Sequence, residues 1–185
     1  MTGFVSGGGN ADAWLMSHRR RPWIGDSARV ATWTARTRLP GPPEAVLALL
    51  TDPDAIALWA PVGFELVDYE GRRLIAGDRV RVRGALAGPS VSFDVDVAEA
   101  DDGRLALTAT GPIRLDVDYR VVALGECSEL RAAVTVSGNG LRGRLLARAT
   151  ETLLAAGALS TAVGRIAEQL ARARSESGRL ALAAA

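Results

Sequence analysis

The sequence contains no lysine, one cysteine and one histidine among its 185 residues. A single cysteine, Cys127, excludes an internal disulfide and a cysteine-based zinc site. The only histidine, His18, lies near the N-terminus, so a histidine-containing catalytic triad or a multi-histidine metal site lacks its residues. These absences exclude most hydrolase and metalloenzyme mechanisms, and we expect neither a metal nor a cofactor.

Long hydrophobic runs and a strong net charge are also missing. Hydrophobic residues make up 48% of the chain, but no apolar run approaches the roughly 18 residues of a membrane span. All 22 basic residues are arginines, and they balance 21 acidic residues to a net charge of +1. So small a net charge offers no overall field for nucleic acid. We therefore expect no membrane insertion and no nucleic-acid partner, while the oligomeric state stays open.

The first 27 residues combine SGGGN with SHRRRPW, and Pro22 and Gly25 interrupt the apolar stretch that a secretory signal would need after its arginines. The length suits one domain. We predict a cytoplasmic protein with a loosely ordered N-terminal extension, one domain over residues 28–175 and a tail over residues 176–185.

Apolar and charged residues alternate through much of residues 78–137, with the period of half-buried antiparallel strands. From Ile113 to Val121 every odd position is apolar or aromatic and every even position is charged. Short turns such as AGPS, DDGR and GECS predict hairpins between the runs. The chain as a whole is predicted to form seven strands, at about 29–39, 63–70, 78–85, 90–99, 104–110, 113–124 and 129–138.

The turns also predict the register of the hairpins. A first hairpin centred on residues 87–88 places Arg81 opposite Asp94, and a last hairpin centred on residues 126–127 places Tyr119 opposite Val134. With this register, the alternating apolar positions of all these strands lie on the same face of the sheet, and we call this their parity. The aspartates point the other way, where cross-strand ion pairs contribute roughly 0.2–1 kcal/mol each. We therefore interpret the following residues as a surface ladder rather than a metal site: Asp94, Asp96, Asp116 and Asp118.

After SGNG the apolar residues recur every three or four positions, as on one face of a helix. We predict a single helix over residues 141–173, about 50 Å long at 1.5 Å per residue, with Gly157 and Gly164 inside it. Its apolar stripe is predicted to contain Leu145, Ala149, Thr152, Ala156, Leu159, Val163, Ile166 and Leu170.

The stretch LPGPPEAVLALLTDPDAIALWAP, residues 39–61, ends the first strand, because proline lacks a backbone donor and fixes φ. Two short helices are predicted to follow, with Trp59 at the end of the second. The predicted fold class is α+β: a seven-stranded antiparallel sheet curled around a long C-terminal helix, with two short helices between strands 1 and 2.

This order of elements resembles the SRPBCC superfamily, also called START-like or polyketide cyclase/dehydrase-like. The resemblance covers about residues 28–173, includes Gly77–Asp78 at the third strand, and matches Pro43, Glu44, Val46, Leu49, Leu50, Asp52, Pro53 and Trp59. It implies a helix-grip fold and a cavity for a hydrophobic ligand between the sheet and the long helix. Trp59 would lie either at the mouth of that cavity or packed beneath the helix pair.

Residues of inward parity are the candidate lining of this cavity, and nearly all are apolar, as in ligand pockets. For each of them core packing is the alternative role. On the strands they are Trp33, Ala35, Val80, Val82, Phe93, Val95, Leu105, Leu107, Leu115, Val117, Tyr119, Val134 and Val136. Beside them we place Trp59 and, on the long helix, Thr152, Leu153, Ala156 and Gly157.

Three functions are consistent with this resemblance. The first is binding of a small hydrophobic or aromatic molecule that is lipid-, quinone- or polyketide-like. The second is a cofactor-free polyketide cyclase or dehydratase, for which Tyr119 is the candidate acid because it is the one inward titratable group of the meander. The third is an accessory subunit of a redox enzyme, since GALAGPSVSFDVDV is similar to the carbon-monoxide-dehydrogenase accessory type.

Overall fold

The computed structural model describes residues 30–61, 63–67, 69–85 and 90–183. Seven strands form one antiparallel sheet in the order β1-β7-β6-β5-β4-β3-β2. They are β1 (Ala31–Pro40), β2 (Phe64–Val67), β3 (Arg79–Ala85), β4 (Ser90–Asp101), β5 (Arg104–Thr110), β6 (Arg114–Leu124) and β7 (Cys127–Ser137). The helices are α1 (Pro43–Thr51), α2 (Pro53–Trp59), α3 (Gly140–Ala155) and α4 (Ala158–Ala183).

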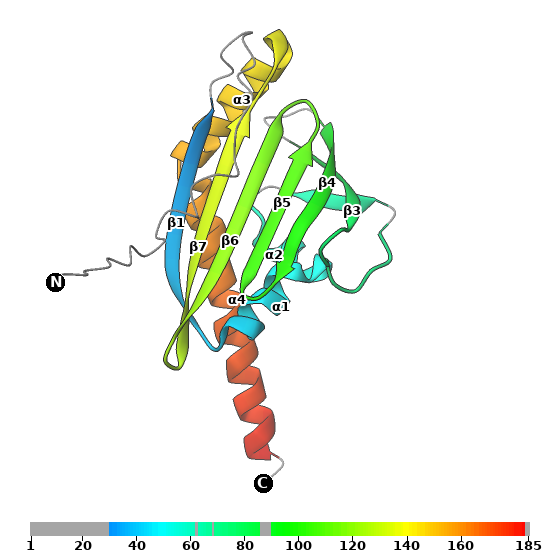
Figure 1. Ribbon diagram of the computed structural model, residues 1–185. Coiled ribbons are helices and arrows are strands. Elements are labelled where there is room, and N and C mark those ends of the chain that lie inside the picture. The colour runs from blue at the N-terminus through cyan, green and yellow to red at the C-terminus, as the bar shows by residue number, and fades with distance from the viewer. Residues whose placement is uncertain (1–29, 62, 68, 86–89, 184–185) are drawn as a thin grey trace, which may run out of the picture.

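All four helices of the described residues lie on one side of the curved sheet, and the other face, which none of them covers, points toward the viewer in Figure 1. We call the helix-covered side the inner face and the open side the outer face. The predicted fold class is confirmed: the seven-stranded antiparallel sheet curls around a long C-terminal helix, with two short helices between β1 and β2. No helix in the described part of the chain is long and apolar enough to cross a membrane.

The proline-rich turn after β1 positions α1. Gly41 has φ +102°, a conformation that favours glycine, and its carbonyl oxygen accepts a hydrogen bond of 2.7 Å from the buried Ser128 hydroxyl. Pro43 then begins α1, where its missing N–H costs no helical hydrogen bond. Asp52 caps α2 by accepting hydrogen bonds from the backbone N–H groups of residues 54 and 55.

The predicted register of the first hairpin is confirmed, because Arg81 lies opposite Asp94. The predicted register of the last hairpin is wrong by two residues. Gly125, at φ +61°, places the turn earlier in the chain than predicted, so Tyr119 lies opposite Ala132 instead of Val134. The shift is an even number of residues, so every side chain keeps its predicted face.

The single long helix predicted over residues 141–173 is wrong, because Gly157 interrupts it. Its φ of +94° lies outside the helical region, so α3 ends two residues before it and α4 starts immediately after it. The predicted stripe holds on α4, where Leu159, Val163, Ile166 and Leu170 are buried. It fails on α3, where Leu145 is 73% exposed and the buried residues are Gly143, Ala147 and Thr150.

At the other end of the chain, α4 continues to Ala183, so the helix extends into the predicted tail at 176–185. The predicted N-terminal extension, residues 1–27, lies outside the described residues.

Candidate functional site

The inner face is not evenly buried. Half-buried apolar side chains remain on β1 and on β3 to β6, and we call this set the inner-face band: Trp33, Val82, Phe93, Leu107, Leu115 and Val117. Their parity turns them away from the outer face. The surface that they expose therefore lies on the side of the helices.

The distribution of the helices explains this band. Helix α1 packs on β4, β5, β6 and β7, where it buries one end of the inner face, including Leu105 and Val121. Helices α3 and α4 pack chiefly on β1 and β7. The inward side chains near the start of β4, such as Phe93, and those of Leu107 on β5 and Val117 on β6 therefore receive less cover, and an apolar surface remains accessible there.

Trp59 and Tyr119 meet where the band joins the buried end. Trp59 ends α2 and is 5% exposed, and Tyr119 on β6 is 6% exposed. Their ring centroids are 5.9 Å apart and the ring planes meet at 83°, the edge-to-face arrangement that aromatic pairs prefer. Of the two positions considered for Trp59, the structure therefore places it in the core rather than at a mouth.

Both residues carry a polar group without a protein partner. The Trp59 indole N–H is buried and forms no hydrogen bond with the described residues. The Tyr119 hydroxyl forms no hydrogen bond with them either. Burial raises the pKa of Tyr119, so this hydroxyl is protonated at neutral pH and can donate. Buried polar groups such as the Trp59 N–H usually have a hydrogen-bond partner, and ligand sites combine an apolar lining with a few polar groups.

The structure separates the predicted lining residues by burial. Trp59 and these strand residues are buried: Val80, Val95, Leu105, Tyr119, Val134 and Val136. Half-buried are the inner-face band and Ala35.

The prediction of lining residues on the long helix is wrong, because these residues do not face the sheet. Thr152, Leu153 and Ala156 are exposed, and Gly157 lies at the helix break. The reason is the change of helical phase at Gly157, which turns a different face of α3 inward. Leu146 and Leu154 pack against the core instead. Their spacing of eight residues, which matches two turns of helix, is the signal that could have identified them.

The predicted surface ladder of aspartates is confirmed in its placement. Arg79 Nε lies 2.6 Å from Asp96, and Arg81 Nε lies 3.0 Å from Asp94. Asp116 and Asp118 also bind arginines. Across the described residues, no group of three or more histidine, cysteine or acidic side chains is placed to hold a metal ion. Chemically, the inner face can bury apolar surface and donate hydrogen bonds from two groups.

Neither a family model nor a curated protein sequence matches this chain. Solved structures do match it. A START superfamily protein from Mycobacterium smegmatis is 19% identical, with a TM-score of 0.55 over 75% of this chain and 98% of its own. The Zhui aromatase/cyclase from Streptomyces sp. R1128 is 16% identical, with a TM-score of 0.59 over 78% of this chain and 95% of its own.

A third solved structure, norcoclaurine synthase from Thalictrum flavum, is 10% identical, with a TM-score of 0.57 over 81% of this chain and 99% of its own. At these identities the likeness shows the fold. The chain has the helix-grip fold that the sequence predicted, and it shares this fold with the START superfamily protein.

Proposed function

We propose that this protein binds a small, mostly apolar molecule on the inner-face band and holds one oxygen of that molecule with Trp59 and Tyr119. The observation that carries the proposal is the pair of hydrogen-bond groups without protein partners beside a half-buried apolar surface. A fold alone selects no function, but two of the structures with this fold are named as enzymes, an aromatase/cyclase and a norcoclaurine synthase.

The chemistry of the two groups indicates what kind of oxygen they would bind. An indole N–H only donates, and a protonated tyrosine hydroxyl can donate as well. A ketone, quinone or ester carbonyl is therefore the fitting partner. Burial of the remaining apolar surface would contribute roughly 25 cal/mol per Å², so affinity comes mainly from the hydrocarbon part and orientation from the carbonyl.

Calorimetric titration with tetralin and tetralone tests this proposal, because the two bicyclic molecules differ by one carbonyl group. We expect both to bind, and tetralone to bind about tenfold more tightly, which is the range of one or two buried hydrogen bonds. Binding should change little with salt, because an apolar site uses few screened charges.

Two variants identify the groups involved. Tyr119→Phe and Trp59→Phe should reduce the preference for tetralone and leave tetralin binding nearly unchanged. The control is Tyr69→Phe, which removes the other tyrosine hydroxyl, one that binds Arg73 and Asp78 in a loop. Absence of binding by both molecules, or an equal affinity for them, would contradict the proposal.

The second candidate is a cyclase or dehydratase in which Tyr119 donates a proton to a carbonyl oxygen. The Zhui structure, which has this fold, is named an aromatase/cyclase. Burial raises the pKa of Tyr119, which keeps its hydroxyl protonated for a hydrogen bond to the carbonyl but makes it a weaker acid. General acid catalysis contributes about 10²–10⁴-fold. A turnover of poly-β-keto substrates that falls by about that factor in Tyr119→Phe would favour the enzyme; a protein that only binds would show no turnover to lose.

A further inference from the structure

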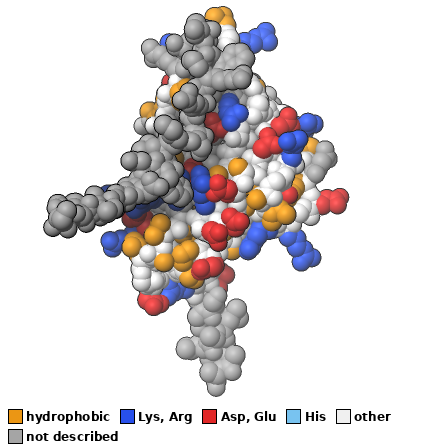
Figure 2. Space-filling view, viewed as in Figure 1, with side chains coloured by type: hydrophobic (Ala, Val, Ile, Leu, Met, Phe, Trp, Pro, Cys, Tyr) orange, Lys and Arg blue, Asp and Glu red, His pale blue; other side chains and the backbone are white. Residues whose placement is uncertain are grey.

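The outer face carries an unusual row of arginines. Arg36 lies opposite Arg131, Arg131 lies opposite Arg120, and Arg120 lies opposite Arg104, so the row crosses β1, β7, β6 and β5. Like charges directly opposite each other on neighbouring strands are destabilising. In Figure 2, which views this face, basic and acidic side chains intermingle across the visible surface.

Acidic side chains neutralise one end of the row more than the other. On β5, Arg104 binds Glu99 at 2.7 Å and Asp118 at 2.9 Å. Asp118 is shared with Arg120, at 3.2 Å. Arg131 has Glu129 at 2.5 Å. At the β1 end, Arg36 forms no ion pair or hydrogen bond with the described residues, and it interacts only through its charge with Glu129, which already binds Arg131.

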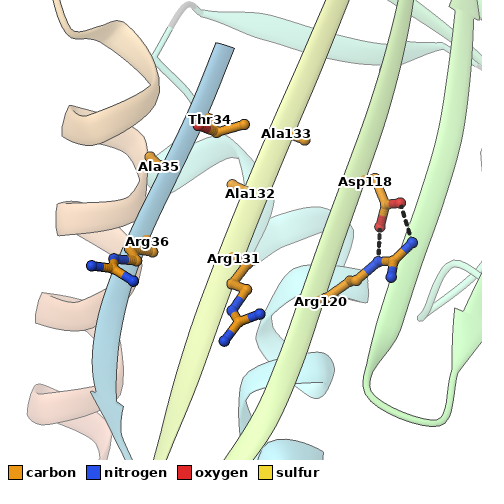
Figure 3. A pocket seen from close by; sticks show the side chains of 8 residues that line it. All are labelled: Thr34, Ala35, Arg36, Asp118, Arg120, Arg131, Ala132 and Ala133. Atoms are coloured by element: carbon orange, nitrogen blue, oxygen red, sulfur yellow. Dashed lines mark hydrogen bonds and ion pairs between the residues drawn. The ribbon is translucent and has the colours of Figure 1, made fainter. Parts of the chain in front are cut away.

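Small side chains lie beside this less neutralised end. Thr34 lies opposite Ala133, and Ala133 lies opposite Asp118. With Arg36, Arg131 and Arg120 they line a groove of about 690 Å³ (Figure 3). Neighbouring strands are about 5 Å apart, so the three arginines span about 10 Å. The groove therefore combines room for a ligand with the positive charge of the arginines.

We propose that this groove is a second binding site, for a compact ligand with at least two negative charges from phosphate or carboxylate groups. Guanidinium groups bind such oxygens with two parallel hydrogen bonds, and Thr34 adds a hydroxyl at the groove. The site lies on the outer face, on the opposite side of the sheet from the inner-face band. It is independent of the function proposed for that band.

Pyrophosphate is the probe, titrated by calorimetry into the full chain at low and high salt. We expect saturable binding that weakens strongly as sodium chloride is raised, because exposed charges are screened. The double variant Arg36→Gln/Arg131→Gln should bind pyrophosphate about tenfold or more weakly. Asp118→Asn should bind it more tightly, because the neutral amide no longer competes with the ligand for Arg120.

A matched control removes the same charge from the same face. Arg79 and Arg81 lie on β3, each paired with its own aspartate, so Arg79→Gln/Arg81→Gln lowers the net charge equally and should leave the affinity within about twofold. Circular dichroism checks that all variants are folded.

Three results would overturn the proposal: no binding by the parent chain, equal losses in the two double variants, or a failure of pyrophosphate where an oligoglutamate peptide binds. The last would indicate an acidic protein partner instead of a compact ligand.

Discussion

The rings of Trp59 and Tyr119 meet edge to face, with centroids 5.9 Å apart, and join the end of α2 to the middle of β6. The contact closes the buried end of the inner face. It also joins two residues that each carry a hydrogen-bond group without a partner among the described residues. One contact thus contributes both to packing and to the proposed site.

The energy of this ring contact can be measured with a double-mutant cycle on Trp59→Leu and Tyr119→Leu. Aromatic pairs contribute about 0.5–1.5 kcal/mol beyond their burial, and we expect a coupling of that size in the free energy of unfolding. The control cycle pairs Tyr119→Leu with Trp33→Leu. No ring contact joins those residues, so their coupling should be near zero. Equal couplings in the two cycles would mean that the ring geometry adds nothing.

The only two tyrosines should resist ionisation while the protein is folded. Burial, followed by the hydrogen bond to Asp78, raises the pKa of Tyr69 to about 12, and burial raises the pKa of Tyr119. Both exceed the ordinary value of 10, so unfolding releases protons above that pH. The stability that this linkage contributes is complete below pH 10 and is lost as the pH rises toward 12.

Tyrosinate absorbance and denaturant unfolding measure this effect together. The folded protein should show little tyrosinate at pH 10 to 11, whereas the protein in denaturant should titrate near 10. Tyr69→Phe should remove part of the loss of stability above pH 10. A native titration near 10 for both tyrosines would show that neither hydroxyl is protected.

Gly157 and Gly164 should respond oppositely to alanine. Gly157→Ala places a side chain at φ +94° and should destabilise the protein by about 1–2 kcal/mol. Gly164 is exposed within α4, and no atom lies near the position that a Cβ would take there, so Gly164→Ala should stabilise by about 0.5–1 kcal/mol. Thermal unfolding measures both. A stabilising Gly157→Ala would indicate that α3 and α4 join into one helix at little cost.

These glycines also show where the sequence could predict the fold and where it could not. Alternation identified the faces of the strands because a strand has an unambiguous period of two, and an error of two residues in the last hairpin did not alter it. The break in the helix depends on a backbone conformation at Gly157. Glycine permits that conformation without requiring it, so the sequence of this segment is compatible with one helix or with two.

The candidate site was predictable to the same extent. Inward parity identified Tyr119 and the inner-face band, because parity follows from local alternation. The contact between Trp59 and Tyr119 joins segments 60 positions apart, and no local pattern encodes it. The arginine row needed the register of three strand pairs at once, including the hairpin whose register was predicted two residues away from the observed one.

The last prediction concerns the turn that sets α1 against the sheet. Ser128 is fully buried, and its hydroxyl donates to the Gly41 carbonyl across 87 positions of sequence. Ser128→Ala removes the donor and leaves a carbonyl without that partner, which should lower the free energy of unfolding by about 1–3 kcal/mol. Thr152→Ala is the control, since the Thr152 hydroxyl is exposed and binds only the Arg148 carbonyl of its own helix. Its effect should stay within about 0.5 kcal/mol.

Because α1 covers the end of the inner face that contains Tyr119, Ser128→Ala should also increase hydrogen exchange of the β6 amides around Tyr119. Loss of stability without that increase would show that the turn holds β1 and β7 together but does not seat α1.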